Sequence, residues 1–472
     1  MPIKSPPNFL TRFIDKAIDR VEFLHGRPEP TDSPHVSEHI GRIRDSLGIN
    51  VRPGPDDDGW HMPEPVTLDD GTELQLYKDG EAALAAYLAI TKAKRRVLLE
   101  VYIWPSDETG KKFSELLCEK AKAGVAVFVI YDGFGSLLAD KSIFHDMRRA
   151  GCQVVEFHPA LPQRSRWGWR PFNRDHRKLL VVDDDIVGVG GLNIGNRYAG
   201  NWVAPEAKVR PEKMWRDAGV GIRSKAAADR YANAFAKTWR YCLRRGPIGR
   251  TSVFTGLALP KRQVSRIGKV QLAYNGFQPL PGRSPLDLLE DGVDVGCVGS
   301  APAFNSPLRP FLYRLVRDAR KSLSLTMAYF APDDELIEGL CAAARRGVKV
   351  RLMMAGRSDA KILIIAARAF YRTLMDAGCE VYEREGAMLH QKAIVADGEL
   401  SVLGSTNLDY RSIEFNLELS AVIRSEQFAK QLDAMFDHDA QFARHVDPQE
   451  WRERPYRDRL VQWFVSRLRY AL

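Results

Sequence analysis

Histidine, lysine and aspartate recur at one fixed spacing in two widely separated parts of this chain of 472 residues. The first copy reads DHRKLLVVD over residues 175–183, and the second reads LHQKAIVAD over residues 389–397. Each copy is followed by a short turn, GGLN or GSTN, which ends in an asparagine at the same distance from the histidine. A single His-x-Lys-x4-Asp motif is typical of an ordinary surface strand, but two copies with the same trailing asparagine are hard to obtain by chance.

These residue types suit the chemistry of a phosphodiester. The predicted site takes its residues in pairs, one member from each copy: His176 and His390, Lys178 and Lys392, Asn193 and Asn407. One imidazole can attack phosphorus and form a phosphohistidine, while the other protonates the departing alcohol and later deprotonates the incoming one. The two ammonium groups would neutralise the non-bridging oxygens, and the two amides would donate hydrogen bonds to them. Because lysine supplies the positive charge, we predict no metal and no cofactor.

Each half also offers a carboxylate on the strand that follows its motif. Asp217 lies in RDAGVGI and Glu418 in NLELSAV, two apolar segments that align with the carboxylates opposite each other. A carboxylate on such a strand is costly to bury without a partner, so we expect both residues to orient the histidines, with a structural salt bridge as the alternative. Asp183 and Asp397 complete the predicted catalytic set, although we expect them to fix the turn and the lysine strand rather than to contact phosphate.

Local patterns predict how these residues are positioned. His176 and Lys178 alternate along an extended segment, so both side chains leave the same face. The apolar run after the lysine is typical of a buried strand, and the aspartates that follow supply turn chemistry before a second short strand. The same pattern follows Lys392. Each copy therefore predicts a hairpin that presents His, Lys and Asn at one end.

Helices and strands alternate in the same order on both sides of the chain, with glycine at the helix ends. In the first half we predict helices at 80–93, 111–122 and 142–150 and strands at 96–104, 125–131 and 152–157. In the second half we predict helices at 308–319, 335–346 and 366–377 and strands at 322–329, 348–354 and 379–382. The repeat predicts two similar α/β/α domains, each a mixed sheet flanked by helices, related by pseudo-twofold symmetry with the active site at their interface.

Other segments break this pattern. The boundaries that we predict are an N-terminal helix and linker arm at 1–66, a first domain at 67–250, a connection and the entry to the second half at 251–300, a second domain at 301–450 and a basic amphipathic helix at 451–472. The apolar stripe of residues 8–24 either docks on the domain or lies on a membrane surface, and the same two alternatives hold for the C-terminal helix. The loop at 164–170 mixes arginine with tryptophan, which suits a lipid headgroup but also an ordinary polar loop.

Composition and charge limit the kinds of partner and the cellular location that we expect. The net charge of +9 favours an anionic partner, which could be nucleic acid, a phosphorylated substrate or an acidic membrane face. The six cysteines form no close pairs, which is typical of reduced core residues in a cytosolic protein. The N-terminus shows no signal peptide, and no apolar run approaches the ~20 residues of a membrane span. We therefore expect any membrane contact to be peripheral.

The paired motifs resemble the phospholipase D superfamily over roughly residues 67–472. Finer features resemble bacterial cardiolipin synthases of the short type without transmembrane helices: NRDHRK at 173–178, GGLNIG at 190–195, WRD at 215–217, YFAP at 329–332 and GSTNLDYRS at 404–412. The resemblance implies a phosphatidyltransferase that moves a phosphatidyl group between phospholipids and releases a small alcohol. It also implies that His176 is the nucleophile and His390 the acid and base.

Under this resemblance the expected partners are an anionic phospholipid such as phosphatidylglycerol and a membrane surface, at the cytoplasmic face of a bacterial cell membrane, with no obligatory nucleic acid. Two alternatives stay open. One is a hydrolase that uses the same site, either a phospholipase D or a diesterase acting on nucleic acid. The other is a lipid-binding protein without activity.

Overall fold

The computed structural model describes residues 58–161, 163, 172–210, 213–245, 295–299 and 308–467. The predicted N-terminal helix of residues 8–24, most of the predicted arm, the loop at 164–170, most of the predicted connection and the last five residues of the predicted C-terminal helix lie outside these ranges.

The first half is built on an eight-stranded sheet with the order β1-β2-β9-β7-β6-β3-β4-β5. Strands β3, β4 and β5 are parallel, and β6, β7, β9 and β2 continue the sheet in antiparallel pairs. Its main elements are β1 Val66–Thr67, β2 Glu73–Lys78, α3 Gly80–Lys92, β3 Arg96–Val101, α4 Glu108–Lys122, β4 Ala126–Asp132, α5 Lys141–Arg149, β5 Gln153–Phe157, β6 Leu179–Val182, β7 Ile186–Gly190, α6 Asn196–Ala199, β8 Trp215–Arg216, β9 Ala218–Arg223 and α7 Lys225–Arg245.

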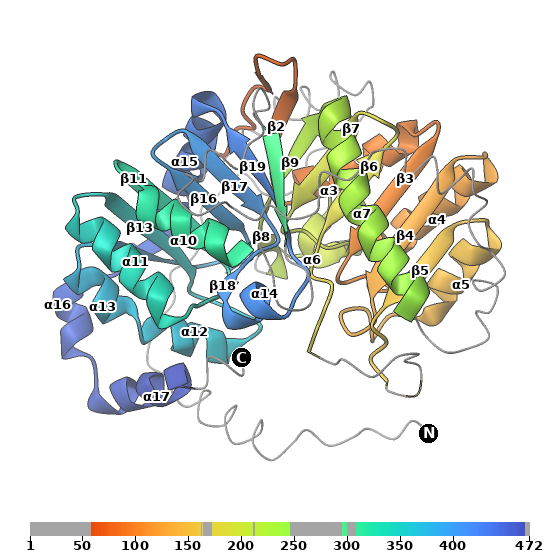
Figure 1. The fold of residues 1–472 in the computed structure, drawn as a ribbon. Helices are drawn as coiled ribbons and strands as arrows, with labels where there is room; N and C mark the ends of the chain where they lie inside the picture. Colours follow the sequence, from red (N-terminus) through yellow and green to blue (C-terminus); the bar gives the residue numbers. More distant parts are fainter. Residues whose placement is uncertain are drawn as a thin grey trace.

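The second half repeats this plan with the order β10-β19-β17-β16-β11-β13-β14-β20 (Figure 1). Its elements are β10 Val295–Gly299, α10 Leu308–Asp318, β11 Ser322–Met327, β12 Phe330–Ala331, α11 Asp334–Arg345, β13 Lys349–Ala355, α12 Lys361–Arg368, α13 Tyr371–Asp376, β14 Glu380–Arg384, β15 Met388–Leu389, β16 Lys392–Ala396, β17 Leu400–Gly404, β18 Leu408–Asp409, α14 Tyr410–Glu414, β19 Leu419–Arg424, α15 Glu426–Ala440, β20 Ala443–His445, α16 Pro448–Glu453 and α17 Tyr456–Arg467. Two mixed sheets flanked by helices confirm the predicted α/β class.

Matching local signals build both halves. Asp107 and Asp333 cap α4 and α11 by accepting hydrogen bonds from backbone amides of the first turn, at 2.9 and 3.0 Å. The turns that follow these helices need a left-handed residue, and Gly124 and Gly347 supply it with φ angles of 87° and 92°. The repeated helix–glycine–strand pattern in the sequence therefore corresponds to equivalent turns in the two halves.

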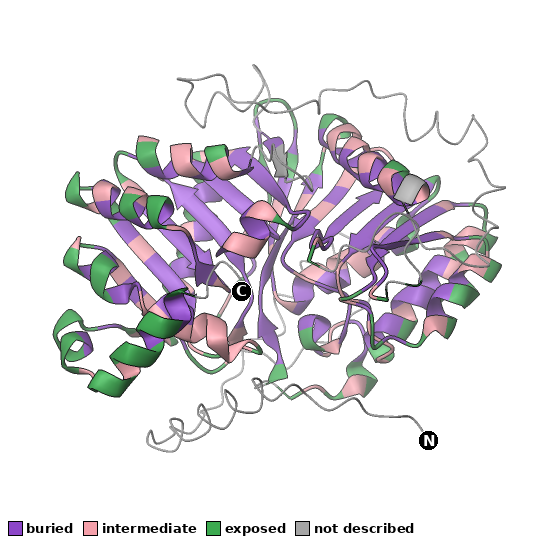
Figure 2. Cartoon of the chain, turned by 60° about the horizontal axis from the view of Figure 1, so that its bottom comes forward, coloured by how far each residue is buried: buried purple, intermediate pink, exposed green. Residues whose placement is uncertain are grey.

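Each sheet lies between two layers of helices. One face of the first sheet packs on α3, α4 and α5, and one face of the second packs on α10, α11 and α13. The other two faces are covered by α7 and α15 and join in a single apolar cluster that includes Val189 of β7, Phe235 of α7, Leu403 of β17 and Phe428 of α15. Burying each such side chain stabilises the fold by about 1.5–3 kcal/mol. The seam between the halves is therefore a continuous core, as the buried inner strands show (Figure 2).

Two predicted helices differ from the structure. The predicted helix at 366–377 is two helices, α12 and α13, because the chain makes tight turns at Ala369 and Phe370, whose amides donate to carbonyls three residues back. The predicted helix that begins at Trp451 is also two helices, α16 and α17. Pro455 separates them, since a proline disfavours helical geometry in the residue before it, here Arg454.

Candidate active site

The two motifs lie at the centre of their sheets. Strand β6 begins directly after Lys178 and β16 begins at Lys392, so His176, Lys178 and His390 lie just before the strands of their motifs and not on them as predicted. Both histidines and both lysines are buried. Each lysine acts electrostatically on both imidazoles, which means that the four groups, predicted as pairs from distant parts of the chain, share one site.

Both imidazoles are held by carboxylates, and the pairs cross the seam. Nδ1 of His176 lies 3.0 and 3.1 Å from the two carboxylate oxygens of Glu418, and Nδ1 of His390 lies 2.6 Å from Oδ2 of Asp217. A carboxylate can only accept, so the proton sits on Nδ1 and leaves Nε2 with a lone pair. The structure thus brings both predicted orienting residues to the histidines, but each half supplies the carboxylate for the histidine of the other half.

Backbone hydrogen bonds create this crossing. The amide of His176 donates to the carbonyl of Leu417 at 2.9 Å, and the amide of His390 donates to the carbonyl of Arg216 at 2.7 Å. Residues 388–389 of β15 also run parallel to β8. Each motif is therefore joined to the residue directly before the opposite carboxylate, which fixes both rings relative to the seam.

Burial sets the charge of the site. Burial, together with the lysine charges, lowers the pKa of His176 to about 4 and that of His390 to about 3, even though the carboxylates act in the other direction. Burial likewise lowers the pKa of Lys178 to about 7 and that of Lys392 to about 8. Near neutral pH the rings are therefore neutral, and the lysines lie close to their titration range.

The lysine and asparagine side chains are held by the backbone. Nζ of Lys178 donates to the carbonyl of His176 at 2.5 Å, and Lys392 makes the equivalent contact with His390. The amide oxygen of Asn193 accepts from the amide of Ile103, and its Nδ2 donates to the hydroxyl of Tyr198 at 2.8 Å.

The second asparagine is held in the same way. The amide oxygen of Asn407 accepts a hydrogen bond from the backbone amide of Tyr329. In both halves the amide oxygen thus faces the chain, which leaves the NH₂ group as the donor that the predicted phosphate contact requires.

The structure does not bring Asp183 and Asp397 to this site, which corrects their place in the predicted catalytic set. Each lies past the far end of its strand with a left-handed backbone, at φ of 50° and 56°. Their carboxylates accept from three consecutive backbone amides, those of residues 94–96 and 320–322 respectively. They fix the turns, as the sequence also suggested, and act on the lysine strands from a distance.

Replacing Asp183 with Ala is expected to lower the free energy of unfolding by about 1–3 kcal/mol, because three amides lose a charged acceptor. Asp183→Asn keeps the left-handed preference and an acceptor, so its loss should be smaller. Chemical denaturation measures the first effect, and turnover per folded molecule should remain near the native value. A large loss of turnover with unchanged stability would show that the carboxylate acts in catalysis.

Aromatic side chains that the motifs did not predict surround the two imidazole rings. The ring of Tyr102 packs edge-on to His176 at 5.1 Å between centroids, and those of Trp215, Tyr198 and Tyr329 lie 4.8, 5.5 and 6.5 Å from His390. Tyr102 and Tyr329 occupy equivalent places in the repeat, and that correspondence was the available signal.

Ser405 is a further residue that the motif pattern did not single out. Its hydroxyl donates to Glu418 at 2.5 Å. The equivalent position in the first half is Gly191, where a Cβ atom would lie 2.2 Å from Oδ1 of Asp217. The Gly/Ser difference between the two turns therefore follows from the closer approach of the aspartate.

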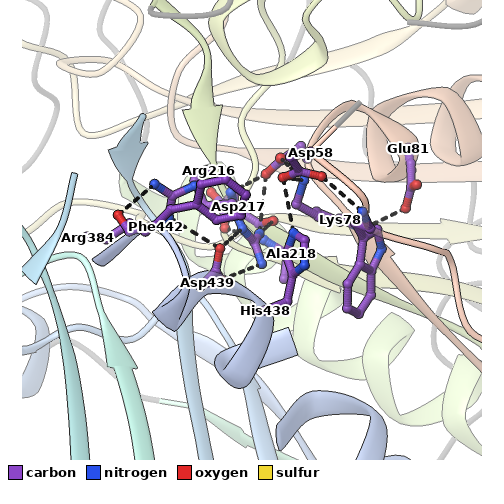
Figure 3. Close-up of polar contacts among 12 residues, drawn as sticks. Asp58, Lys78, Glu81, Arg216, Asp217, Ala218, Arg384, His438, Asp439 and Phe442 are labelled. Atoms are coloured by element: carbon purple, nitrogen blue, oxygen red, sulfur yellow. Dashed lines mark hydrogen bonds and ion pairs between the residues drawn. The ribbon is translucent and has the colours of Figure 1, made fainter. Parts of the chain in front are cut away.

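A network of charges supports Asp217 from behind (Figure 3). Its neighbour Arg216 is buried and makes two hydrogen bonds to Asp439 of α15, at 2.8 and 2.7 Å, while the amide of Asp217 donates to Asp79 at 2.6 Å. Burial alone would lower the pKa of Arg216, but the carboxylates of Asp439 and Asp79 outweigh it and raise that pKa. This bidentate pair ties the first half to the second next to the site.

The described ranges contain neither a cluster of metal ligands nor a membrane-spanning helix. No three His, Cys, Asp or Glu side chains in these ranges lie close enough to hold a metal ion. Nor does any described helix have the length and apolar character required to span a membrane.

Two similar α/β halves that each bring His, Lys and Asn to one seam define the phospholipase D class of proteins. The family model described as "Cardiolipin synthase, PLD-like domain" matches residues 88–239 and 312–440. The chain therefore belongs to the cardiolipin synthase family of the phospholipase D superfamily and is a cardiolipin synthase-like phosphatidyltransferase, which confirms the resemblance seen in the motifs.

Individual relatives agree. The chain is 31% identical over 411 residues to a cardiolipin synthase of Geobacillus sp. (strain WCH70), covering 86% of this chain and 72% of that protein. It is 29% identical over 402 residues to cardiolipin synthase 1 of Bacillus cereus, covering 84% and 72%. The crystal structure of phosphatidylserine synthase from Haemophilus influenzae superposes with a TM-score of 0.62 at 16% identity, covering 86% of this chain and 94% of that one, and thereby shows the same fold.

Proposed function

We propose that this enzyme transfers a phosphatidyl group from one phosphatidylglycerol molecule to the headgroup hydroxyl of another, which makes cardiolipin and releases glycerol. The observation that carries the proposal is the pair of imidazoles, each with Nδ1 on a carboxylate of the other half and Nε2 unprotonated beside the two lysines. The synthase activity of the relatives supports the choice of acceptor.

In the proposed first step, Nε2 of His176 attacks phosphorus and the P–O bond to glycerol breaks. Protonated His390 gives its proton to the departing alkoxide, so that a phosphohistidine and free glycerol result. In the second step, neutral His390 takes the proton from the hydroxyl of the second lipid, whose oxygen attacks phosphorus as the P–N bond breaks. The lysines and the asparagine amides stabilise the charge on the non-bridging oxygens throughout.

The charges around His390 support its role as acid and base. Its pKa is low because of burial and because Lys392 and Lys178 add positive charge. A bound phosphodiester brings a negative charge between these groups, which counters the lysines and raises the affinity of the ring for a proton. The acid needed for the first step is thus favoured only when substrate is present.

The test uses purified protein with vesicles of phosphatidylglycerol and, in parallel, with plasmid DNA. Cardiolipin and glycerol in equal amounts, measured by mass spectrometry, are expected. Phosphatidic acid in place of cardiolipin would identify a hydrolase, and cleavage of DNA without lipid turnover would overturn the lipid substrate. Vesicle binding without any turnover would favour a lipid-binding protein.

We also propose that α17 holds the enzyme at the anionic cytoplasmic surface of the bacterial cell membrane. Helix α17 packs on α12 through Val465, which is buried with Ala331 and Ala366. Its other large apolar side chains are exposed, with Trp463 and Phe464 at 56% and 60%. Exposed aromatics beside arginines on a short helix suit a membrane interface, where anionic lipids attract the positive charge.

Replacing both Trp463 and Phe464 with Ser is expected to weaken binding to phosphatidylglycerol vesicles by at least about tenfold, because two inserted aromatic side chains are lost. The matched variant with Trp463→Phe and Phe464→Leu keeps the apolar area and should bind almost as well. Co-sedimentation with vesicles measures both. Equal binding by the Ser variant would contradict the role of α17.

A further inference from the structure

A cavity of about 340 Å³ lies between α3 and the first sheet and reaches the active site. Lys178 and Asn193 line one end of it, and Glu73 and Arg223 line the other. We infer that this cavity binds one acyl chain of a phospholipid whose headgroup lies at the two histidines, an inference that rests on the proposed function.

A missing side chain at Gly188 leaves this cavity open on the side of the sheet. Gly188 of β7 pairs with Gly221 of β9, where a Cβ atom would lie 2.9 Å from the ring of Tyr77. A Cβ atom added to Gly188 would meet only Leu180, at 3.6 Å, so open space lies above this strand. Glycine in the interior of a strand weakens a sheet and often marks close approach of a ligand.

The helix side of the cavity is equally small. Helix α3 reads GEAALAAYLAITK, and most of the residues that it contributes to the cavity lining are alanines: Ala82, Ala83, Ala85, Ala86 and Ala89. Its last turn adds Ile90 and Lys92. An amphipathic helix normally buries large apolar side chains against its sheet. Alanine opposite glycine leaves a gap between two otherwise well-packed layers.

The second half provides an internal comparison. The residues equivalent to Gly188 and Gly221 are Val402 and Val422, which pair across β17 and β19 in the same register. Helix α10, the counterpart of α3, contributes Phe311 and Leu312 to the same apolar cluster as these valines. The second half therefore places larger side chains at the positions where the first half has these glycines.

The dimensions suit a hydrocarbon chain. At roughly 30 Å³ for a group the size of water, 340 Å³ holds on the order of ten methylenes. The five residues of β7 span about 17 Å along the cavity at ~3.4 Å per residue. Most of the wall between the two ends consists of apolar side chains and glycine backbone, with Gln75, Glu100 and Thr109 as the polar exceptions, and this mainly apolar lining favours an acyl chain over ordered water. Continuity with Lys178 places the start of that chain beside the proposed phosphate site.

Filling the cavity tests the inference. Gly188→Val copies the residue of the second half, and Ala86→Leu fills the same space from the helix if the first variant folds poorly. Either change should raise KM for long-chain phosphatidylglycerol by at least about tenfold, because each lost methylene contact weakens binding roughly fourfold. Turnover of dihexanoyl phosphatidylglycerol, whose chains are too short to fill the cavity, should stay near the native value. Val402→Ala is the control and should leave the chain-length dependence unchanged.

Binding of cis-parinaric acid, a fluorescent long-chain fatty acid, gives a readout that does not require turnover. The native protein should bind the probe, and Gly188→Val should lose at least about tenfold in affinity. If Gly188→Val loses probe binding but the native protein makes no cardiolipin, the acyl-chain site is supported and the proposed reaction is rejected. If the filled variants bind the probe and show the same KM as the native protein, the acyl-chain site is overturned but the transferase activity is not. An equal loss of turnover with short-chain and long-chain phosphatidylglycerol would also overturn the acyl-chain site.

Discussion

His176→Ala is expected to reduce phosphatidyl transfer by at least about 10⁴-fold, because the variant lacks the nitrogen that forms the bond to phosphorus. Chromatography of labelled lipid products measures the loss. His145→Ala is the matched control, since this histidine lies on α5 with its side chain 68% exposed and should leave turnover unchanged.

The same experiment assigns the two histidines. His390→Ala should also lose transfer, yet it keeps the proposed nucleophile. A rapid quench of this variant with phosphatidyl-p-nitrophenol, whose leaving group needs no acid, should therefore leave an acid-labile phosphatidyl group on the peptide that contains His176. A label on the peptide with His390 in the His176→Ala variant would reverse the roles. Full turnover in His176→Ala would refute the catalytic assignment altogether.

Asp217→Asn and Glu418→Gln are expected to lower kcat by about 10²–10⁴-fold with little change in KM, because each imidazole loses the anion that holds its tautomer and supports its positive charge. Burial alone would raise the pKa of both carboxyls, but their histidines and the lysines outweigh it and keep both ionised. Asp376→Asn removes an exposed carboxylate on α13 and serves as the control.

A substrate with a better leaving group separates the two variants. Phosphatidyl-p-nitrophenol needs no acid to expel its phenolate, so Asp217→Asn, which acts on His390, should recover most of its first-step rate. Glu418→Gln acts on the proposed nucleophile and should not recover. Asp217→Asn should also move to lower pH the limb of the pH profile that His390 controls, because this carboxylate raises the pKa of His390. Equal recovery with an unmoved profile would indicate a purely structural role for Asp217.

Much of the fold and the site could be predicted from local sequence. Apolar periodicity and glycine turns such as Gly124 and Gly347 depend only on neighbouring residues. The structure contains the helices and strands that they predicted, apart from the two divided helices and the strand that was expected to include His176 and Lys178. The duplicated spacing predicted that His176 and His390 share one site, because each motif forms a hairpin that presents its histidine at the same end. In the structure both histidines are buried, and both lysines act on each of them.

The remainder depends on docking between distant segments. The sequence shows that Asp217 and Glu418 are equivalent, but which carboxylate faces which ring is decided by the hydrogen bonds of Leu417 and Arg216 across the seam. The Arg216–Asp439 pair likewise joins residues 223 positions apart, and no local sequence pattern predicts it. The roles of Asp183 and Asp397 were ambiguous because motif spacing does not say which end of the strand faces the site.

The crossed carboxylates have a consequence for synthesis on the ribosome. A nascent chain that has emerged only as far as α7 contains His176 and Asp217 but neither Glu418 nor His390, so it carries no complete imidazole–carboxylate dyad. The same holds for any proteolytic fragment cut between the two sheets. The active site is therefore complete only after the whole polypeptide has folded. Cleavage between the two sheets followed by separation of the fragments would abolish the activity.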